Sequence, residues 1–267
     1  MKIVTFNLRY ENPWDGVYRF ENRFPYIVNR IQRELSDLIG FQEMLPEMAE
    51  KLKEALPEYY ILGHGREADL TGEQTAVGFL KNRFHLFRMR TFWLSETPDV
   101  PGSRYEGQSP CPRTCTCLTL YSLMEKQLFR IYNTHLDHSG SYARKIGLDQ
   151  IIREMKKDNA EKPLPALLMG DFNTTPENPE LNSLREWPWL TDRTKNAEGT
   201  FHNFGREKPP VKIDYIFATG QWKQKHEETV LWKEQHNGLW LSDHYPVSVE
   251  MYLEKSNNSD FFTVMKK

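Results

Sequence analysis

The chain has 267 residues, of which 39% are hydrophobic and 13% are aromatic, so it is long enough for one large α/β domain with a sizeable core. Its 35 Lys and Arg residues against 37 Asp and Glu residues give a formal net charge of −2, which argues against a protein that grips long duplex DNA through many phosphate contacts. No run of about 18 or more apolar residues is present to form a transmembrane helix, and a strand-like run that begins at Lys2 leaves no room for a secretory signal. We therefore expect a cytoplasmic protein that does not bind membranes.

Short apolar runs alternate with amphipathic segments along the chain, which is typical of layered α/β proteins. The spacing of apolar residues predicts helices over 22–36, with Pro25 in the first turn, over 46–56, and after Ser141. Strands are expected, in chain order, at 2–7, 38–42, 59–62, 75–81, 86–94, 114–123, 127–134, 166–169, 213–218 and 247–253. We interpret the block from 59 to 134 as strands joined by short turns, which predicts an antiparallel meander.

Two mixed, mainly antiparallel sheets, packed face to face with helices outside, would accommodate both the meander and the strand–helix–strand flanks. We expect residues 1–254 to form this single domain of the α/β class. The polar segment 255–267 is expected to be a frayed tail.

The three cysteines, Cys111, Cys115 and Cys117, lie in one short stretch. An odd, clustered set is a poor disulfide framework, and no Cys or His pair at a matching spacing completes a zinc site. Since Cys115 and Cys117 would share one face of a strand, we expect them to be buried as small apolar side chains.

One pattern recurs along the chain: an apolar strand ends, and an acid, an amide or a histidine follows. The residues in these positions are Asn7, Glu43, His135, Asp171 with Asn173, Asp214, and Asp243 with His244. Singly, each could be a turn former, an Asx turn or a solvated loop acid. Because ligands bind at strand ends, the recurrence of suitable residue types favours a shared catalytic site.

The oxygen ligands Glu43, Asp243 and Asn7 suit Mg²⁺, with Mn²⁺ as an alternative. Such a metal polarises a phosphoryl group and steadies the leaving oxygen. This combination of residues predicts the hydrolysis of a phosphate ester.

The remaining strand-end residues suit acid–base and electrostatic roles. Asp171, with Asn173 holding the geometry, can orient and deprotonate the attacking water. His244 backed by Asp214 can stay charged and bind a phosphoryl oxygen. His135 can neutralise charge that grows on the transferred group.

The chain resembles the endonuclease/exonuclease/phosphatase superfamily in motifs that span nearly its whole length. These are Thr5-Phe6-Asn7, Gln42-Glu43, Asn133-Thr134-His135-Leu136-Asp137-His138, Gly170-Asp171-Phe172-Asn173, Ile213-Asp214-Tyr215-Ile216-Phe217 and Ser242-Asp243-His244-Tyr245-Pro246-Val247. The resemblance implies a four-layer α/β/β/α sandwich and the same site roles as those given above.

Further segments are similar to a bacterial branch near the deadenylase-type nucleases, among them Asn12-Pro13-Trp14-Asp15-Gly16, Pro112-Arg113 and Gly199-Thr200-Phe201-His202. The chain departs from the pattern of this branch at Cys115 and Cys117, where we would expect larger or different side chains. This departure does not affect the catalytic positions. Four more residues are candidates for contact with substrate, although each could equally form a structural ion pair or hydrogen bond: Arg113, Arg144, His138 and His202.

The motifs lead us to expect a phosphodiesterase of nuclease or exonuclease type that acts on a short substrate, such as a nucleic-acid end. The alternative is a phosphomonoesterase of a small phosphorylated metabolite such as a sugar phosphate, which the near-neutral charge favours. A binding module that has lost turnover is a third reading, disfavoured because every expected catalytic position is filled. The sequence does not indicate an oligomeric state.

Overall fold

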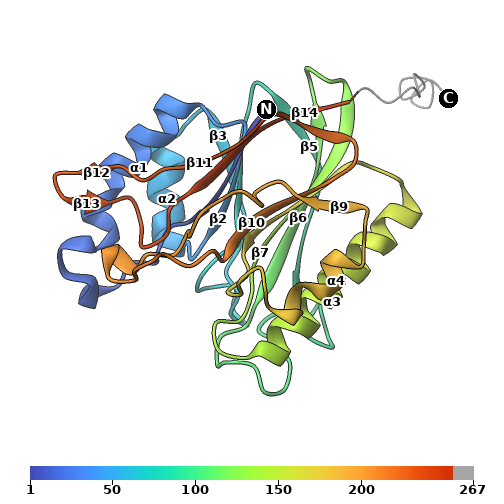
Figure 1. Ribbon diagram of the computed structural model, residues 1–267, viewed down its shortest axis with the longest axis horizontal. Helices are drawn as coiled ribbons and strands as arrows, with labels where there is room; N and C mark the ends of the chain where they lie inside the picture. The colour runs from blue at the N-terminus through green and yellow to red at the C-terminus, as the bar shows by residue number, and fades with distance from the viewer. Residues whose placement is uncertain (255–267) are drawn as a thin grey trace.

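The computed structural model describes residues 1–254, so the expected frayed tail at 255–267 lies outside the described residues. Two six-stranded sheets pack face to face, and helices cover the outer face of each (Figure 1). This arrangement confirms the expected four-layer α/β/β/α sandwich of two mixed sheets. Within residues 1–254, no helix is both long enough and apolar enough to cross a membrane.

The first sheet has the strand order β11-β14-β1-β2-β4-β3, and only the neighbours β1 and β2 run parallel. Helices α1 (Phe20–Glu34) and α2 (Pro46–Ala55) cover its outer face through a shared apolar cluster. The strands are β1 (Lys2–Asn7), β2 (Leu38–Gln42), β3 (Tyr59–Leu62), β4 (Val77–Leu80), β11 (Trp222–Leu231) and β14 (Val247–Leu253).

The second sheet has the order β5-β6-β7-β8-β10-β9, with β7 and β8 as its parallel pair. Helices α3 (Ser141–Glu161) and α4 (Asn182–Arg185) pack on its outer face. The strands are β5 (Phe84–Trp93), β6 (Thr114–Ser122), β7 (Gln127–His135), β8 (Ala166–Asp171), β9 (Leu190–Asp192) and β10 (Asp214–Thr219). A small hairpin of β12 (Gln235–His236) and β13 (Leu239–Trp240) lies apart from both sheets.

The expected single meander from 59 to 134 is wrong, because its strands divide between the two sheets. The chain leaves the first sheet after β4 and enters the second at β5, so only β5, β6 and β7 form a meander. A long loop, 94–113, joins β5 to β6 in place of a short turn. Pro25 also lies inside α1, since the helix begins earlier than expected, at Phe20. The burial expected for Cys115 and Cys117 is confirmed, and both thiols are free.

A polar contact between the sheets fixes how their strand ends align. The core between the sheets contains a large apolar cluster. Within it, the Asn133 side chain on β7 donates hydrogen bonds of 2.8 Å to the carbonyls of Phe41 and Ala76. Asn133 Oδ1 accepts a hydrogen bond from Gln42 Nε2 at 2.7 Å. Because these groups are buried and mutually satisfied, they hold β2 and β7 in one relative position.

Candidate active site

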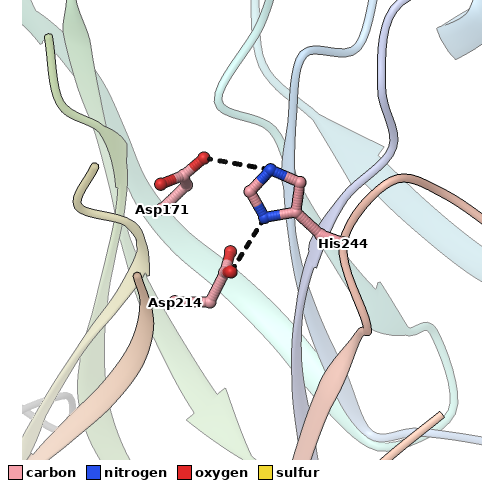
Figure 2. A group of neighbouring side chains, drawn as sticks. All are labelled: Asp171, Asp214 and His244. Carbon is pink, nitrogen blue, oxygen red and sulfur yellow. Dashed lines mark hydrogen bonds and ion pairs between the residues drawn. The ribbon is translucent and has the colours of Figure 1, made fainter. Parts of the chain in front are cut away.

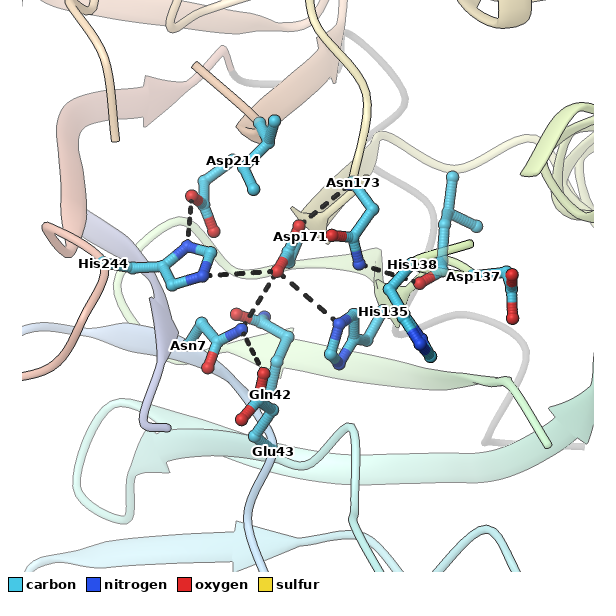
Figure 3. A network of polar contacts seen from close by, with 12 residues as sticks. Asn7, Gln42, Glu43, His135, Asp137, His138, Asp171, Asn173, Asp214 and His244 are labelled. Atoms are coloured by element: carbon cyan, nitrogen blue, oxygen red, sulfur yellow. Dashed lines mark hydrogen bonds and ion pairs between the residues drawn. The ribbon is translucent and has the colours of Figure 1, made fainter. Parts of the chain in front are cut away.

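The polar residues at the strand ends meet around one cavity of about 860 Å³. β1, β2, β7 and β8 all end at this edge of the sandwich, and the antiparallel strands β10 and β14 begin there. The cavity walls include Glu43, His135, Asp171, Asn173, Asp243 and His244. Asn7 and Asp214 lie behind them, in hydrogen-bond contact with members of this set (Figure 3).

Asp171 is the centre of this polar network (Figure 3). Its carboxylate accepts hydrogen bonds of 2.9 Å from the Asn7 side chain and from the backbone N–H of Asn173. Gly170, with φ of +145°, lets β8 approach β7 closely, because a Cβ there would lie 1.9 Å from the carbonyl oxygen of Thr134. This close pairing sets His135 directly opposite Asp171.

The environment of Asp171 suits a general base at neutral pH. Burial, helped by the neighbouring carboxylate of Asp214, raises the pKa of Asp171 to about 7. A base whose pKa lies near the working pH combines a useful fraction of the ionised form with enough driving force for proton transfer.

His244 and Asp214 form a tight buried pair (Figure 2). His244 Nδ1 lies 2.9 Å from Asp214 Oδ2, and its Nε2 lies 3.7 Å from Asp171 Oδ2. Burial alone disfavours the charged imidazole, but the carboxylates of Asp214 and Asp171 outweigh it and raise the pKa of His244 to about 10. The two carboxylates therefore favour the charged form of this buried ring at neutral pH.

His135 has the opposite electrostatic character. Burial, together with the charges of Arg113 and Arg66, lowers the pKa of His135 well below its ordinary value. Its Nε2 lies 3.5 Å from Asp171 Oδ2 and its Nδ1 lies 4.0 Å from Glu73 Oε2. The uncharged ring can support a transferred group as a hydrogen-bond donor rather than as a cation.

Two groups of side chains could hold a divalent metal. Ligand atoms of Asp171, Asp214 and His244 lie within 4.8 Å of one another. This triad is already internally paired, however, and a protonated His244 has no lone pair to offer a metal.

The carboxylates of Glu43 and Asp243 fit a divalent cation better. Both line the cavity. The pKa of Asp243 is raised mainly by burial and also by the negative charge of Glu43. A hard cation between such oxygen donors would relieve this repulsion.

Asn7 connects the metal-binding candidates to the proposed base. Its Nδ2 donates to Glu43 at 3.0 Å and to Asp171 at 2.9 Å. Its Oδ1 accepts the backbone N–H of Arg9 at 2.9 Å. In this orientation the amide positions both carboxylates, and its role as a direct metal ligand stays a prediction.

The structure brings only part of the expected substrate-binding set to the cavity. Arg113 and His138 line it. Arg144 does not, because Glu180 binds its guanidinium at 2.8 and 3.0 Å. His202 is buried outside the cavity, with its ring stacked 4.0 Å from that of Tyr245.

The sequence interpretation missed the charged residues that loops contribute to the cavity. These are Arg9, Glu11, Asp15, Arg66, Glu73 and Arg206. They do not follow apolar strands, so the strand-end pattern could not reveal them. Two signals were present, because Arg9 lies two residues after the Thr5-Phe6-Asn7 motif and Asp15 lies within the segment Asn12-Pro13-Trp14-Asp15-Gly16.

Comparisons with known proteins find relatives that match nearly the whole chain. The model of the Endonuclease/Exonuclease/phosphatase family matches residues 4–244. A solved endonuclease/exonuclease/phosphatase from Bacteroides vulgatus is 32% identical, with a TM-score of 0.88 and 95% and 98% of the two chains covered. A mannosyl-6-phosphatase from Bacteroides thetaiotaomicron is 29% identical, with a TM-score of 0.85 over 95% of this chain and 100% of that chain. An uncharacterised protein of Acanthamoeba polyphaga mimivirus is 26% identical over 93% of this chain and 99% of its own.

Proposed function

This chain belongs to the endonuclease/exonuclease/phosphatase family, whose members are phosphoester hydrolases, and we propose that it is a divalent-metal-dependent phosphomonoesterase of a small phosphorylated metabolite such as a sugar phosphate. The motifs alone favoured a nuclease-type phosphodiesterase. The charges of the cavity walls favour a phosphomonoesterase instead.

The proposed mechanism assigns the metal to Glu43 and Asp243, with Asn7 holding Glu43 in place. A bound Mg²⁺, or Mn²⁺ in its stead, would polarise the phosphoryl group and stabilise the leaving oxygen. The hard carboxylate oxygens of this pair match what either ion prefers.

The remaining residues orient the nucleophile and bind the phosphoryl group. Asp171 accepts the proton of the attacking water, and the Asn173 backbone N–H fixes the orientation of its carboxylate. The charged His244 binds a phosphoryl oxygen and stays charged because of Asp214. His135 donates a hydrogen bond to the same group as negative charge grows on it.

The observation that carries the choice of substrate is the pairing of arginines with acids around the cavity. Asp15 binds the Arg9 guanidinium at 2.9 and 3.0 Å. Glu73 binds that of Arg66 at 2.7 and 2.8 Å. These walls offer balanced charge rather than the basic track that follows a nucleic-acid backbone. The likeness to a mannosyl-6-phosphatase supports the same choice.

A second candidate is a phosphodiesterase that acts on a short nucleic-acid end. Phe201 lines the cavity with its ring 5.0 Å from that of His244, and an aromatic ring there could stack on a base. The exposed Arg206 on the same wall could contact a second phosphate.

Hydrolysis of a monoester and a diester by the same preparation separates the two candidates. We expect phosphate release from mannose 6-phosphate in Mg²⁺, none in EDTA, and much slower cleavage of bis(p-nitrophenyl) phosphate. Faster cleavage of the diester than of any monoester would contradict the proposal and favour the second candidate.

A further inference from the structure

One wall of the cavity carries a rigid ion pair that the proposed mechanism does not use. Arg66 and Glu73 both lie on the loop between β3 and β4, and both line the cavity. The Arg66 guanidinium donates two parallel hydrogen bonds to the Glu73 carboxylate, at 2.7 and 2.8 Å. The Arg66 backbone N–H also binds the carbonyl of Glu73, and Trp93 Nε1 donates to the carbonyl of Arg66 at 2.6 Å. The pair is therefore held in place before any ligand binds.

Arg113 on the same wall has spare hydrogen-bonding capacity. Its side chain is buried, with the residue only 4% exposed. Its Nε and Nη1 find no hydrogen-bond acceptor within residues 1–254, and the Oδ2 atom of Asp137 lies 3.9 Å from Nε. An unsatisfied buried guanidinium is costly, so a ligand oxygen that reaches this side chain would gain a hydrogen bond that the described chain does not supply.

His138 adds a donor whose position follows from its contact with Arg113. Arg113 Nη2 lies 2.8 Å from His138 Nδ1. Since a guanidinium only donates, Nδ1 must accept. Burial and the charge of Arg113 lower the pKa of His138, which keeps the ring neutral. A neutral ring that accepts at Nδ1 carries its proton on Nε2, where it can donate to a ligand.

These residues together form what we name the polar wall: Arg66, Glu73, Arg113 and His138. We propose that the polar wall is a specificity subsite that binds the ring hydroxyls of a phosphorylated sugar next to the phosphate centre. The inference rests on the proposed function and deepens it.

The chemistry of the polar wall matches a polyol better than a second phosphate. A hydroxyl group both donates and accepts, and the wall offers carboxylate acceptors beside guanidinium and imidazole donors. Because Glu73 neutralises Arg66 and Asp137 lies 3.9 Å from Arg113 Nε, the wall offers little net positive charge to a second phosphate. The wall also adjoins the catalytic centre, because Glu73 Oε2 lies 4.0 Å from His135 Nδ1.

The first test compares two substrates that share the phosphate but differ in hydroxyls, mannose 6-phosphate and p-nitrophenyl phosphate. The variant is Glu73→Gln, which keeps the shape but removes the carboxylate acceptor. We expect the ratio of kcat/KM for mannose 6-phosphate over p-nitrophenyl phosphate to fall roughly 10- to 100-fold, the effect of losing hydrogen bonds to a charged group. An unchanged ratio overturns the inference.

The matched control is Glu180→Gln. Glu180 binds Arg144 through two hydrogen bonds of 2.8 and 3.0 Å, the same geometry as in the Arg66–Glu73 pair, but neither residue lines the cavity. We expect the substrate ratio of this variant to match the wild type. An equal fall in both variants would mean that the ratio reports general loss of packing, and it would count against the subsite.

The second test uses the wild-type protein and needs no variant to fold. Free mannose should inhibit hydrolysis of p-nitrophenyl phosphate competitively, whereas the deoxygenated analogue 1,5-anhydro-2-deoxy-hexitol should inhibit at least several-fold more weakly. Equal or absent inhibition by the two compounds contradicts the subsite. If the wild type hydrolyses no monoester at all, the proposed function fails instead, so the two failures are distinguishable.

Discussion

The Nε2 atom of His244 lies 3.7 Å from the Oδ2 atom of Asp171, so the proposed base and the proposed phosphate-binding cation are immediate neighbours. Each sets the protonation of the other: Asp171 raises the pKa of His244, and His244 opposes the rise that burial causes in Asp171. The two side chains are thus one electrostatic unit rather than two independent groups.

Substitutions in this unit should therefore be non-additive. We expect Asp171→Asn and His244→Ala each to lower kcat by about 10²–10⁴-fold, the usual contribution of a positioned proton-transfer group. The double variant should be little worse than either single variant. Steady-state kinetics on the three proteins measures this, and losses that multiply would show that the two groups act separately.

A plot of kcat/KM against pH should have an acidic limb and an alkaline limb. Since Asp171 must be ionised to accept a proton, kcat/KM should rise as the pH passes through about 7. Since His244 must be charged, kcat/KM should fall as the pH approaches about 10. Asp214→Asn removes the carboxylate that supports the imidazolium, so the alkaline limb should move to lower pH. A profile of the Asp214→Asn protein with an unmoved alkaline limb would disprove the assignment of that limb to His244.

Loss of the Glu43 carboxylate should abolish metal-dependent activity while the fold survives. Glu43→Gln keeps the shape of the side chain, and we expect at least a ~10²-fold fall in turnover, in line with the loss of a catalytic metal contact. Titration calorimetry with Mg²⁺ should show weaker binding. The control is Glu47→Gln, because Glu47 is an exposed acid on the neighbouring helix α2. This substitution should leave turnover and Mg²⁺ affinity unchanged. Wild-type activity that persists in EDTA would refute the metal assignment.

The site residues at the strand ends could be predicted because the pairing of a few strands brings them together. Asp171 and Asp214 face each other across β8 and β10, and His135 faces Asp171 across β7 and β8. Once these strands form with their polar residues at one edge, the side chains must converge.

The loop residues of the site could not be predicted in the same way. Arg66 and Glu73 depend on how a loop folds against Trp93, which no periodicity encodes. Arg144 was expected to contact substrate but does not line the cavity. Its guanidinium instead binds Glu180, an acid that is distant in the sequence. β11 was missed because several of its side chains are charged and exposed, so its sequence lacks the pattern of a half-buried strand.

The polar contact between the sheets should govern stability rather than chemistry. Asn133→Ala leaves the buried carbonyls of Phe41 and Ala76 without their side-chain donor, and it leaves Gln42 Nε2 without its closest acceptor. We expect the free energy of unfolding to fall by about 2–4 kcal/mol. Urea denaturation measures this, with the exposed Asn196→Ala as control. A change equal to that of the control would show that the contact does not stabilise the sandwich.

The central claim is a metal-dependent phosphomonoesterase with one phosphate site and a small substrate, and the salt dependence of KM across substrates of increasing length tests it most directly. The comparison takes mannose 6-phosphate, a mononucleotide, a short oligonucleotide and long single-stranded RNA at low and high salt in Mg²⁺. Because the arginines Arg9 and Arg66 are neutralised by acids, we predict the highest kcat/KM for the sugar phosphate and a KM that changes little with salt. Strong preference for the long RNA, with a KM that rises steeply with salt, would contradict the account and establish a nuclease that follows the backbone.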